Sequence, residues 1–169
     1  MRRVSKLLAV LLLLGGCGSP APAPATSAIA TSGAGNRHTS ADVRFAQALI
    51  PHHREGIALA SAVARQPAAR TLAEAIIVTE QDEVVRMTGW LREWSADLPA
   101  ASSPAASSLA TPSSAAGNPV RALIAHQEEA IRLAQQEQAG GANPAALAFA
   151  KQIVESRTEE IAQLRTYLG

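Results

Sequence analysis

One segment of this chain occurs twice, and the repetition limits the folds that the chain can adopt. Residues 48–60 read ALIPHHREGIALA, and residues 122–134 read ALIAHQEEAIRLA. Each copy is followed by a further segment that also matches, with Glu83 in one copy opposite Glu160 in the other. A duplicated unit of two apolar helices explains both matches.

Composition and local signals indicate that each unit is a pair of helices. Ala and Leu dominate both blocks, aromatic residues are few and no strand-like alternation is present, which favours α-helix. Asn118-Pro119 and Asn143-Pro144 each place a capping side chain before a proline that suits the first helical position. The turn inside each unit is short, so its two helices are expected to be antiparallel. The chain is therefore predicted to be all-α, a four-helix bundle built from two repeated antiparallel helix hairpins.

Caps and helix breakers predict where the four helices begin and end. Ser40 or Asp42 is expected to cap the first helix, and Pro51 inside it is expected to kink it. The expected helices run from residue 40 or 42 to about 65, from about 67 to 94, from 119 to about 140, and from 144 almost to the end of the chain. The hairpins are residues 40–95 and 118–169, and the Ala/Ser/Pro-rich segment 96–117 is expected to be the crossover between them.

The N-terminus has the pattern of a bacterial lipoprotein signal. Basic residues within positions 2–6 precede the apolar run 7–14, which is too short to span a bilayer. Positions 14–17 read LGGC and resemble a lipobox, in which cleavage leaves the cysteine as a lipidated N-terminus. The alternative is a plain signal peptide with an incidental cysteine. We expect residues 1–16 to be removed and Cys17 to anchor the protein to the cell membrane, facing the extracytoplasmic side.

Removal of the signal changes the charge of the chain. The full chain has 15 basic and 14 acidic residues, and residues 1–16 contain three of the basic ones and no acidic one. The mature chain would thus have 12 basic and 14 acidic residues and a net charge of −2. No cluster of Lys or Arg remains, which argues against nucleic acid as a partner. Residues 17–39, rich in Ala, Pro, Ser, Thr and Gly, are expected to be a disordered tether that leads to the bundle, residues 40–169.

Each expected helix carries one ionisable residue within its apolar face. At about 100° per residue, these are His52, Glu83, His126 and Glu160, while His53 falls on the flank of its stripe. A charged carboxylate in an apolar core costs on the order of several kcal/mol unless it is paired or coordinated. One resolution is a metal site, since imidazole and carboxylate together suit Zn, Cu(II), Mn or Fe. The other is a metal-free network in which the histidines and glutamates share hydrogen bonds.

The motif around the first two histidines resembles the DUF305 family, a ferritin-like helical family of bacterial envelope proteins of which some bind copper. The resemblance rests on Asp42, Phe45, IPHH at 50–53, GIALA at 56–60, Gln81, Glu83-Val84, Met87 and Trp90-Leu91. It covers about residues 40–95 well and 118–169 as a second repeat. It implies that His52, His53, Met87 and His126 match positions of the family motif.

The chain departs from the family pattern in two ways that bear on the choice of metal. The family usually has a second His-His, where this chain has His126-Gln127, and it is often rich in Met, whereas the mature chain keeps only Met87. Thioether ligands favour Cu(I), so their loss favours a harder or borderline ion such as Cu(II) or Zn.

These patterns together predict an extracytoplasmic lipoprotein that binds a copper or zinc ion in the bundle core and needs no organic cofactor. The expected ligands are His52, Glu83, His126 and Glu160, with His53 and Met87 as additional candidates. The alternative is a metal-free bundle whose buried His–Glu network makes it an envelope interaction or structural module.

An enzyme is the less favoured reading of the same residues. A di-metal oxidase of the ferritin type needs Glu-x-x-His on two of its helices. This chain has the reverse order, His52-x-x-Glu55 and His126-x-x-Glu129, and both glutamates fall toward the edge of their stripes.

Overall fold

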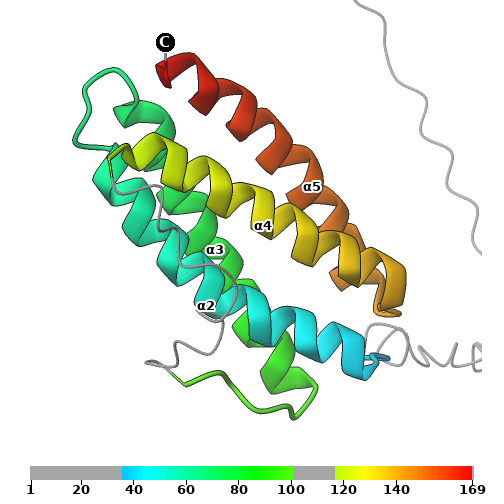
Figure 1. The fold of residues 1–169 in the computed structure, drawn as a ribbon. Coiled ribbons are helices and arrows are strands. Elements are labelled where there is room, and N and C mark those ends of the chain that lie inside the picture. The colour runs from blue at the N-terminus through cyan, green and yellow to red at the C-terminus, as the bar shows by residue number, and fades with distance from the viewer. Residues whose placement is uncertain (1–35, 101–116, 169) are drawn as a thin grey trace, which may run out of the picture.

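A computed structural model describes residues 36–100 and 117–168 of the chain (Figure 1). It contains helices α2 (Ser40–Val63), α3 (Arg70–Glu93), α4 (Pro119–Gly140) and α5 (Pro144–Arg165), and the short 3₁₀-helix η1 (Thr166–Leu168). No strand occurs in these residues. The hairpins α2–α3 and α4–α5 pack against each other, chiefly through α2 and α4. The prediction of an all-α four-helix bundle from two hairpins is confirmed.

The start of α2 differs by one residue from the expected cap. Thr39, rather than Ser40 or Asp42, is the N-cap: its backbone is extended and its side chain accepts a hydrogen bond from the N–H of Ala41. Asp42 lies at the third helical position, where its carboxylate accepts hydrogen bonds from the backbone N–H and the hydroxyl of Thr39 at 2.6 and 2.7 Å. The two residues thus form a capping box. The helix continues through Pro51 to Val63.

The other helix ends follow the sequence signals to different degrees. The side chains of Asn118 and Asn143 accept hydrogen bonds from the first backbone N–H groups of α4 and α5, as predicted. Helix α4 ends at Gly140, also as predicted. Helix α3 begins at Arg70, later than the expected residue 67, because residues 64–69 form a turn held by short-range backbone hydrogen bonds.

Two apolar clusters occupy the two ends of the bundle. One includes Phe45, Leu49, Met87, Leu91, Trp94, Phe149 and Ile153, and the other includes Ala60, Val63, Ile76, Leu123, Ile161 and Leu164. Fully burying a Leu, Ile or Phe side chain contributes about 1.5–3 kcal/mol, so these clusters supply much of the stability of the bundle. On every helix, the residues between the two clusters include buried polar side chains. The bundle therefore has a polar layer across its middle.

The helices are not equally close to one another. The backbones of α2 and α3, of α4 and α5, and of α2 and α4 pack closely along their lengths. In the described residues, the backbones of α3 and α5 make far fewer close approaches. Long side chains join them instead: Trp90 packs edge-on against Phe149 at 5.3 Å between ring centroids, and Arg86 lies over the same ring.

Several expectations fall on residues that the structure does not describe. The signal segment 1–16, Cys17 and most of the crossover, residues 101–116, lie outside the described part of the chain. His38, near the end of the expected tether, stacks on Trp94 with the ring centroids 4.9 Å apart, so the last part of that segment contacts the bundle. None of the described helices combines the length and apolar character that a membrane span requires.

Candidate metal centre

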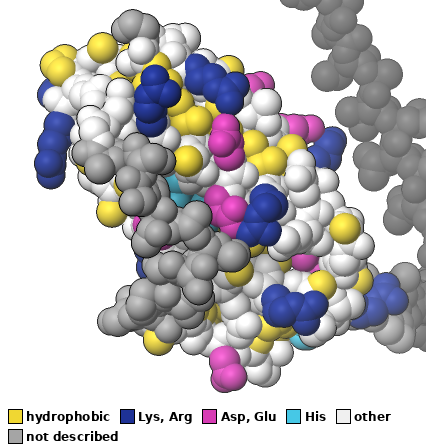
Figure 2. Space-filling view, viewed as in Figure 1, with side chains coloured by type: hydrophobic (Ala, Val, Ile, Leu, Met, Phe, Trp, Pro, Cys, Tyr) yellow, Lys and Arg dark blue, Asp and Glu magenta, His cyan; other side chains and the backbone are white. Residues whose placement is uncertain are grey.

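Each of the four helices contributes two polar side chains, from the same face of the helix, to the layer between the apolar clusters. These are His52 and His53 from α2, Glu80 and Glu83 from α3, His126 and Gln127 from α4, and Arg157 and Glu160 from α5. The sequence predicted five of these positions as ligands and missed Glu80, Gln127 and Arg157. Figure 2 shows a histidine side chain at the surface of the bundle, beside acidic side chains.

His52 and His126 form the histidine half of the layer. Their rings stack with centroids 3.7 Å apart and planes 15° from parallel, and Nε2 of His126 lies 3.0 Å from the backbone oxygen of His52. Burial lowers the pKa of His52 to about 2, helped by the nearby His126, and burial lowers the pKa of His126 to about 4. Both rings are therefore neutral at pH 7, the form that can ligate a metal.

The ring nitrogens of His52 are the least satisfied polar atoms in this half. His52 is only 6% exposed, and neither Nδ1 nor Nε2 has a hydrogen-bond partner among the described residues. A buried polar group without a partner costs about 1–3 kcal/mol, and such groups call for a ligand, a water or a functional reason.

Glu80 approaches the same place across Gly56. A Cβ built on Gly56 would overlap Oε2 of Glu80 and would lie 2.9 Å from Nε2 of His126, so the missing side chain makes room for both groups. Glu80 is 1% exposed, and its Oε2 has no hydrogen-bond partner in the described chain. Burial raises the pKa of Glu80 to about 8, because the opposing charge of Arg157 does not fully compensate.

His53 lies in the core, which corrects the expectation that it sits on the flank of α2. The side chain is fully buried, and its Nε2 lies 2.9 Å from Oε2 of Glu83. The physical reason is that α2 packs against both α3 and α4, so its buried face is wide enough for two neighbouring positions. His52 meets α4, and His53 meets α3. Burial lowers the pKa of His53, although the nearby Glu83 opposes this.

The other half of the layer, the carboxylate half, consists of Arg157 and the carboxyl groups around it. The side chain of Arg157 is fully buried, Nη2 contacts Oε2 of Glu83 and lies 3.8 Å from Oε1 of Glu80, and Nη1 donates to Oε1 of Glu160 at 3.0 Å. Burial acts to lower the pKa of the guanidinium, but Glu83, Glu160 and Glu80 raise it above its ordinary value. The group is therefore a permanent buried cation.

Glu83 and Glu160 are the counter-charges of this cation. Burial acts to raise the pKa of Glu83, but His53 and Arg157 outweigh it and lower the pKa, which favours the ionised form. Burial raises the pKa of Glu160, with Arg157 opposing, and Gln127 donates a hydrogen bond to its Oε2 at 2.9 Å. Glu83 and Glu160, two of the four expected metal ligands, are thus joined by Arg157.

The repeat pairs two of the missed residues with each other and the third, Gln127, with His53, so only Gln127 could have been found from a residue already singled out. Counting from Glu83 and Glu160, the position equivalent to Glu80 is Arg157. The position equivalent to His53 is Gln127. Both equivalents lie in the layer because the two hairpins place the same positions toward the core.

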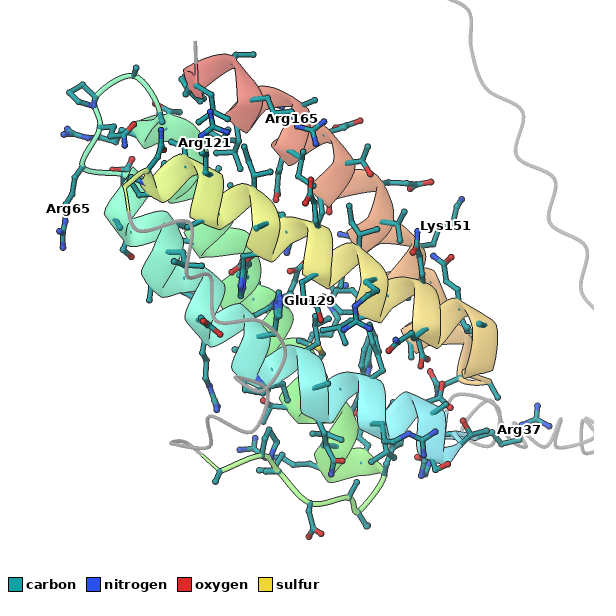
Figure 3. The ribbon with its side chains drawn as sticks, viewed as in Figure 1. Arg37, Arg65, Arg121, Glu129, Lys151 and Arg165 are labelled. Atoms are coloured by element: carbon teal, nitrogen blue, oxygen red, sulfur yellow. The ribbon has the colours of Figure 1, made fainter. Side chains whose placement is uncertain are left out.

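The remaining candidates lie outside the layer. Met87 is fully buried in the apolar cluster with Phe45 and Leu91. Glu55 is exposed. Glu129, labelled in Figure 3, is paired with Arg132 on the same helix at the edge of the bundle.

The two halves of the layer differ in how they fit a metal ion. The carboxylate half does not fit, because a guanidinium already occupies the space among its oxygen atoms. The histidine half has the donors for copper or zinc, namely neutral imidazoles and a nearby carboxyl group. Stacked rings cannot aim their in-plane lone pairs at one ion, so a ring must rotate before both ligate. Accordingly, no group of three or more His, Cys, Asp or Glu side chains in the described residues is already arranged as a metal site.

Comparison with known proteins gives similarity in both sequence and fold. The family described as "Domain of unknown function (DUF305)" matches residues 42–120 and 118–168. The crystal structure of a DUF305 fragment from Deinococcus radiodurans is 24% identical, with a TM-score of 0.66 over 78% of this chain and 97% of that chain. No curated protein sequence matches the chain.

CopM, solved with bound metal, has the same fold. Its Cu(I)-bound form is 26% identical, with a TM-score of 0.59 over 75% of this chain and 94% of that chain. Its Cu(II)-bound form is 25% identical, with a TM-score of 0.59 over 75% of this chain and 95% of that chain.

Proposed function

This chain belongs to the DUF305 family, and on that premise we propose that it binds a transition metal ion through His52 and His126, with Glu80 as a third ligand. One observation carries the proposal. His52 is buried and neutral, and both of its ring nitrogens lack a partner in the described part of the chain. A metal ion would satisfy one of these nitrogens, and His126 and Glu80 are the nearby groups that could complete the site.

The donor set favours copper(II) or zinc. Imidazole and carboxylate are borderline and hard ligands, and the one thioether of the mature chain lies in an apolar cluster. CopM has been solved in a Cu(I)-bound form, at 26% identity, and in a Cu(II)-bound form, at 25% identity, which supports a transition metal ion in this fold. Binding would release the proton that Glu80 holds near pH 7, because a carboxylic acid must ionise before it ligates.

The proposal includes a location at the extracytoplasmic face of the membrane. Its support is the sequence at the N-terminus, where basic residues, a short apolar run and LGGC at positions 14–17 precede the bundle. Lipid on Cys17 would hold the protein to the membrane, and the Pro- and Ala-rich segment would separate the anchor from the helices.

Thermal unfolding of the mature chain with and without metal tests the site. A ligand that binds only the folded state stabilises it by RT ln(1 + [L]/Kd), or about 2.7 kcal/mol at a hundredfold excess over Kd. We expect Cu(II) or Zn to raise the Tm by about 10 °C at that excess. The rise should vanish in the double variant His52→Ala, His126→Ala and persist in His38→Ala, whose ring stacks on Trp94 instead. Absence of any rise with Cu, Zn, Mn and Fe in the unmutated chain would exclude this function.

A metal-free structural module is the second candidate. The observation that favours it is that Arg157 already balances the carboxylates of the layer. On this reading the layer fixes how the two hairpins pack, and the protein serves as an envelope interaction module. The same titration separates the candidates, since a structural module shows no metal-dependent shift in Tm.

A further inference from the structure

The two halves of the polar layer occupy equivalent positions of the repeat but are chemically different. The repeat aligns Glu83 with Glu160, which keeps a carboxylate, and Glu80 with Arg157, which replaces a carboxylate with a cation. We infer that the guanidinium of Arg157 takes the place of a second metal ion in the carboxylate half and excludes metal from it. The conclusion that metal binds only in the histidine half rests on the proposed function. The exclusion of metal from the carboxylate half does not rest on it.

The contacts of Arg157 are those that a bound cation would make. Its Nη1 lies 3.0 Å from Oε1 of Glu160, and its Nη2 contacts Oε2 of Glu83 and lies 3.8 Å from Oε1 of Glu80. Oxygen atoms on two facing helices thus converge on one buried positive charge. A guanidinium is fixed to the chain and always charged, so it holds this place at every metal concentration.

Apart from Arg157, the carboxylate half has the donor groups of a metal site. His53 is fully buried, its Nε2 lies 2.9 Å from the same Glu83 oxygen that Arg157 contacts, and its Nδ1 has no partner among the described residues. Oε1 of Glu83 is likewise unpartnered. Imidazole and carboxylates together suit Zn, Mn or Fe. What separates this cluster from a metal site is therefore the arginine.

The spacing of the helices is consistent with this substitution. The backbones of α3 and α5 approach closely at few points in the described chain, so a group between Glu83 and Glu160 has to bridge them. A metal ion with ligands from both helices would do so, and the long side chain of Arg157 does so here.

The test uses the mature chain with His52→Ala and His126→Ala, so that no ion can bind at the histidine pair. In this background, Arg157→Gln removes the cation and Arg157→Lys is the matched control that keeps it. Zn(II) and Mn(II) are added near pH 7, and both the Tm and the metal retained after gel filtration are measured. We expect Arg157→Gln to retain about one ion per chain and to gain about 10 °C in Tm at a hundredfold excess over Kd. The background protein and Arg157→Lys should gain nothing.

A second variant restores the symmetry of the repeat. Arg157→Glu combined with Gln127→His gives positions 157 and 127 of the second copy the residue types that Glu80 and His53 provide in the first. We expect this protein to be unfolded without metal and helical with Zn(II) or Mn(II), as measured by circular dichroism, because its buried carboxylates then need an added cation.

Three outcomes would overturn the inference. They are a metal-dependent Tm rise in the background protein, an equal response of Arg157→Gln and Arg157→Lys, and failure of both Arg157→Gln and the symmetric variant to respond to either ion. The second and third outcomes say nothing about His52 and His126, so the proposed function is then judged separately, from the unmutated chain. The first outcome would also count against the proposed function, because it places metal binding outside the histidine pair.

Discussion

Nη2 of Arg157 on α5 contacts Oε2 of Glu83 on α3, inside the core and away from solvent. The same oxygen lies 2.9 Å from Nε2 of His53 on α2, so three helices meet at one carboxylate. This contact joins the two hairpins where the backbones of α3 and α5 stay apart. The packing of one hairpin on the other therefore depends on charge as well as on apolar burial.

Replacing Arg157 with Leu is expected to lower the free energy of unfolding by about 3–5 kcal/mol, measured by urea denaturation. The change leaves Glu83 and Glu160 buried without their counter-charge, and that is the costly way to break a buried ion pair. Lys151→Ala is the control, because its pair with Glu155 is largely exposed and should cost less than about 0.5 kcal/mol. A loss below about 1 kcal/mol for Arg157→Leu would show that the cluster is not needed for packing.

The stability of the bundle is expected to fall as the pH rises from about 6.5 to 8.5. Burial raises the pKa of Glu80 to about 8 in the folded chain, so the folded state holds a proton that the unfolded state has already lost. A raised carboxyl pKa gives stability that is complete below the unfolded value and is lost as the pH rises through the folded value. For Glu80 alone the loss across this window is about 2 kcal/mol.

Glu80→Gln provides the comparison, with urea denaturation at several pH values as the measurement. It should flatten the pH dependence between 6.5 and 8.5, apart from the part due to Glu137, whose pKa burial also raises to about 8. In the unfolded chain a histidine has a pKa of about 6.5 and still binds protons at the lower end of this window, whereas burial keeps His52, His53 and His126 neutral in the folded chain, so these histidines oppose part of the fall. Both proteins contain them, so the difference between the two pH profiles isolates Glu80. An unchanged slope in Glu80→Gln would mean that Glu80 is ionised in the folded protein.

Gly56→Ala and Gly89→Ala are expected to act in opposite directions. A Cβ at Gly56 overlaps Oε2 of Glu80, so the substitution should displace the carboxyl group and destabilise the protein by about 1–3 kcal/mol. A Cβ at Gly89 meets nothing within 4 Å, so Ala should stabilise α3 by up to about 1 kcal/mol through helix propensity. Chemical denaturation measures both.

The same pair of variants also reports on the metal site. Gly56→Ala should weaken the Tm rise produced by Cu(II) or Zn, because Glu80 and His126 share the space beside Gly56. Gly89→Ala should leave that rise intact. If Gly56→Ala is as stable as the parent and responds equally to metal, Glu80 does not lie where the proposed site needs it.

Cys17→Ser is expected to release the protein from the membrane or to leave it unprocessed. The hydroxyl of serine cannot take the place of the thiol that carries the lipid, and the tether then has no anchor. Fractionation of cells that express each form shows whether the protein is in the membrane. The mass of its N-terminal segment shows whether the signal was cleaved and lipid attached. Normal cleavage with unchanged membrane retention would contradict lipidation at Cys17.

The four helices and their pairing into hairpins could be predicted from the sequence. The Asn-Pro caps, and the two glycines at 140 and 141 where the third helix was expected to end, are local signals, and local hydrogen bonding and backbone preference decide where a helix begins and ends. The stripes also placed His52, Glu83, His126 and Glu160 toward the interior. Each of these predictions needs only the chain near the residue concerned.

Which polar groups meet depends on how the helices pack, and no single helix predicts it. A helical wheel assumes one buried face, but α2 has two helix neighbours, so His52 and His53 both enter the core and face different partners. Arg157 was missed from the sequence because arginine is rarely buried, and its burial depends on carboxylates from another hairpin. Long side chains cross the space between helices, so their partners are set by how the hairpins pack and not by the helix that carries them.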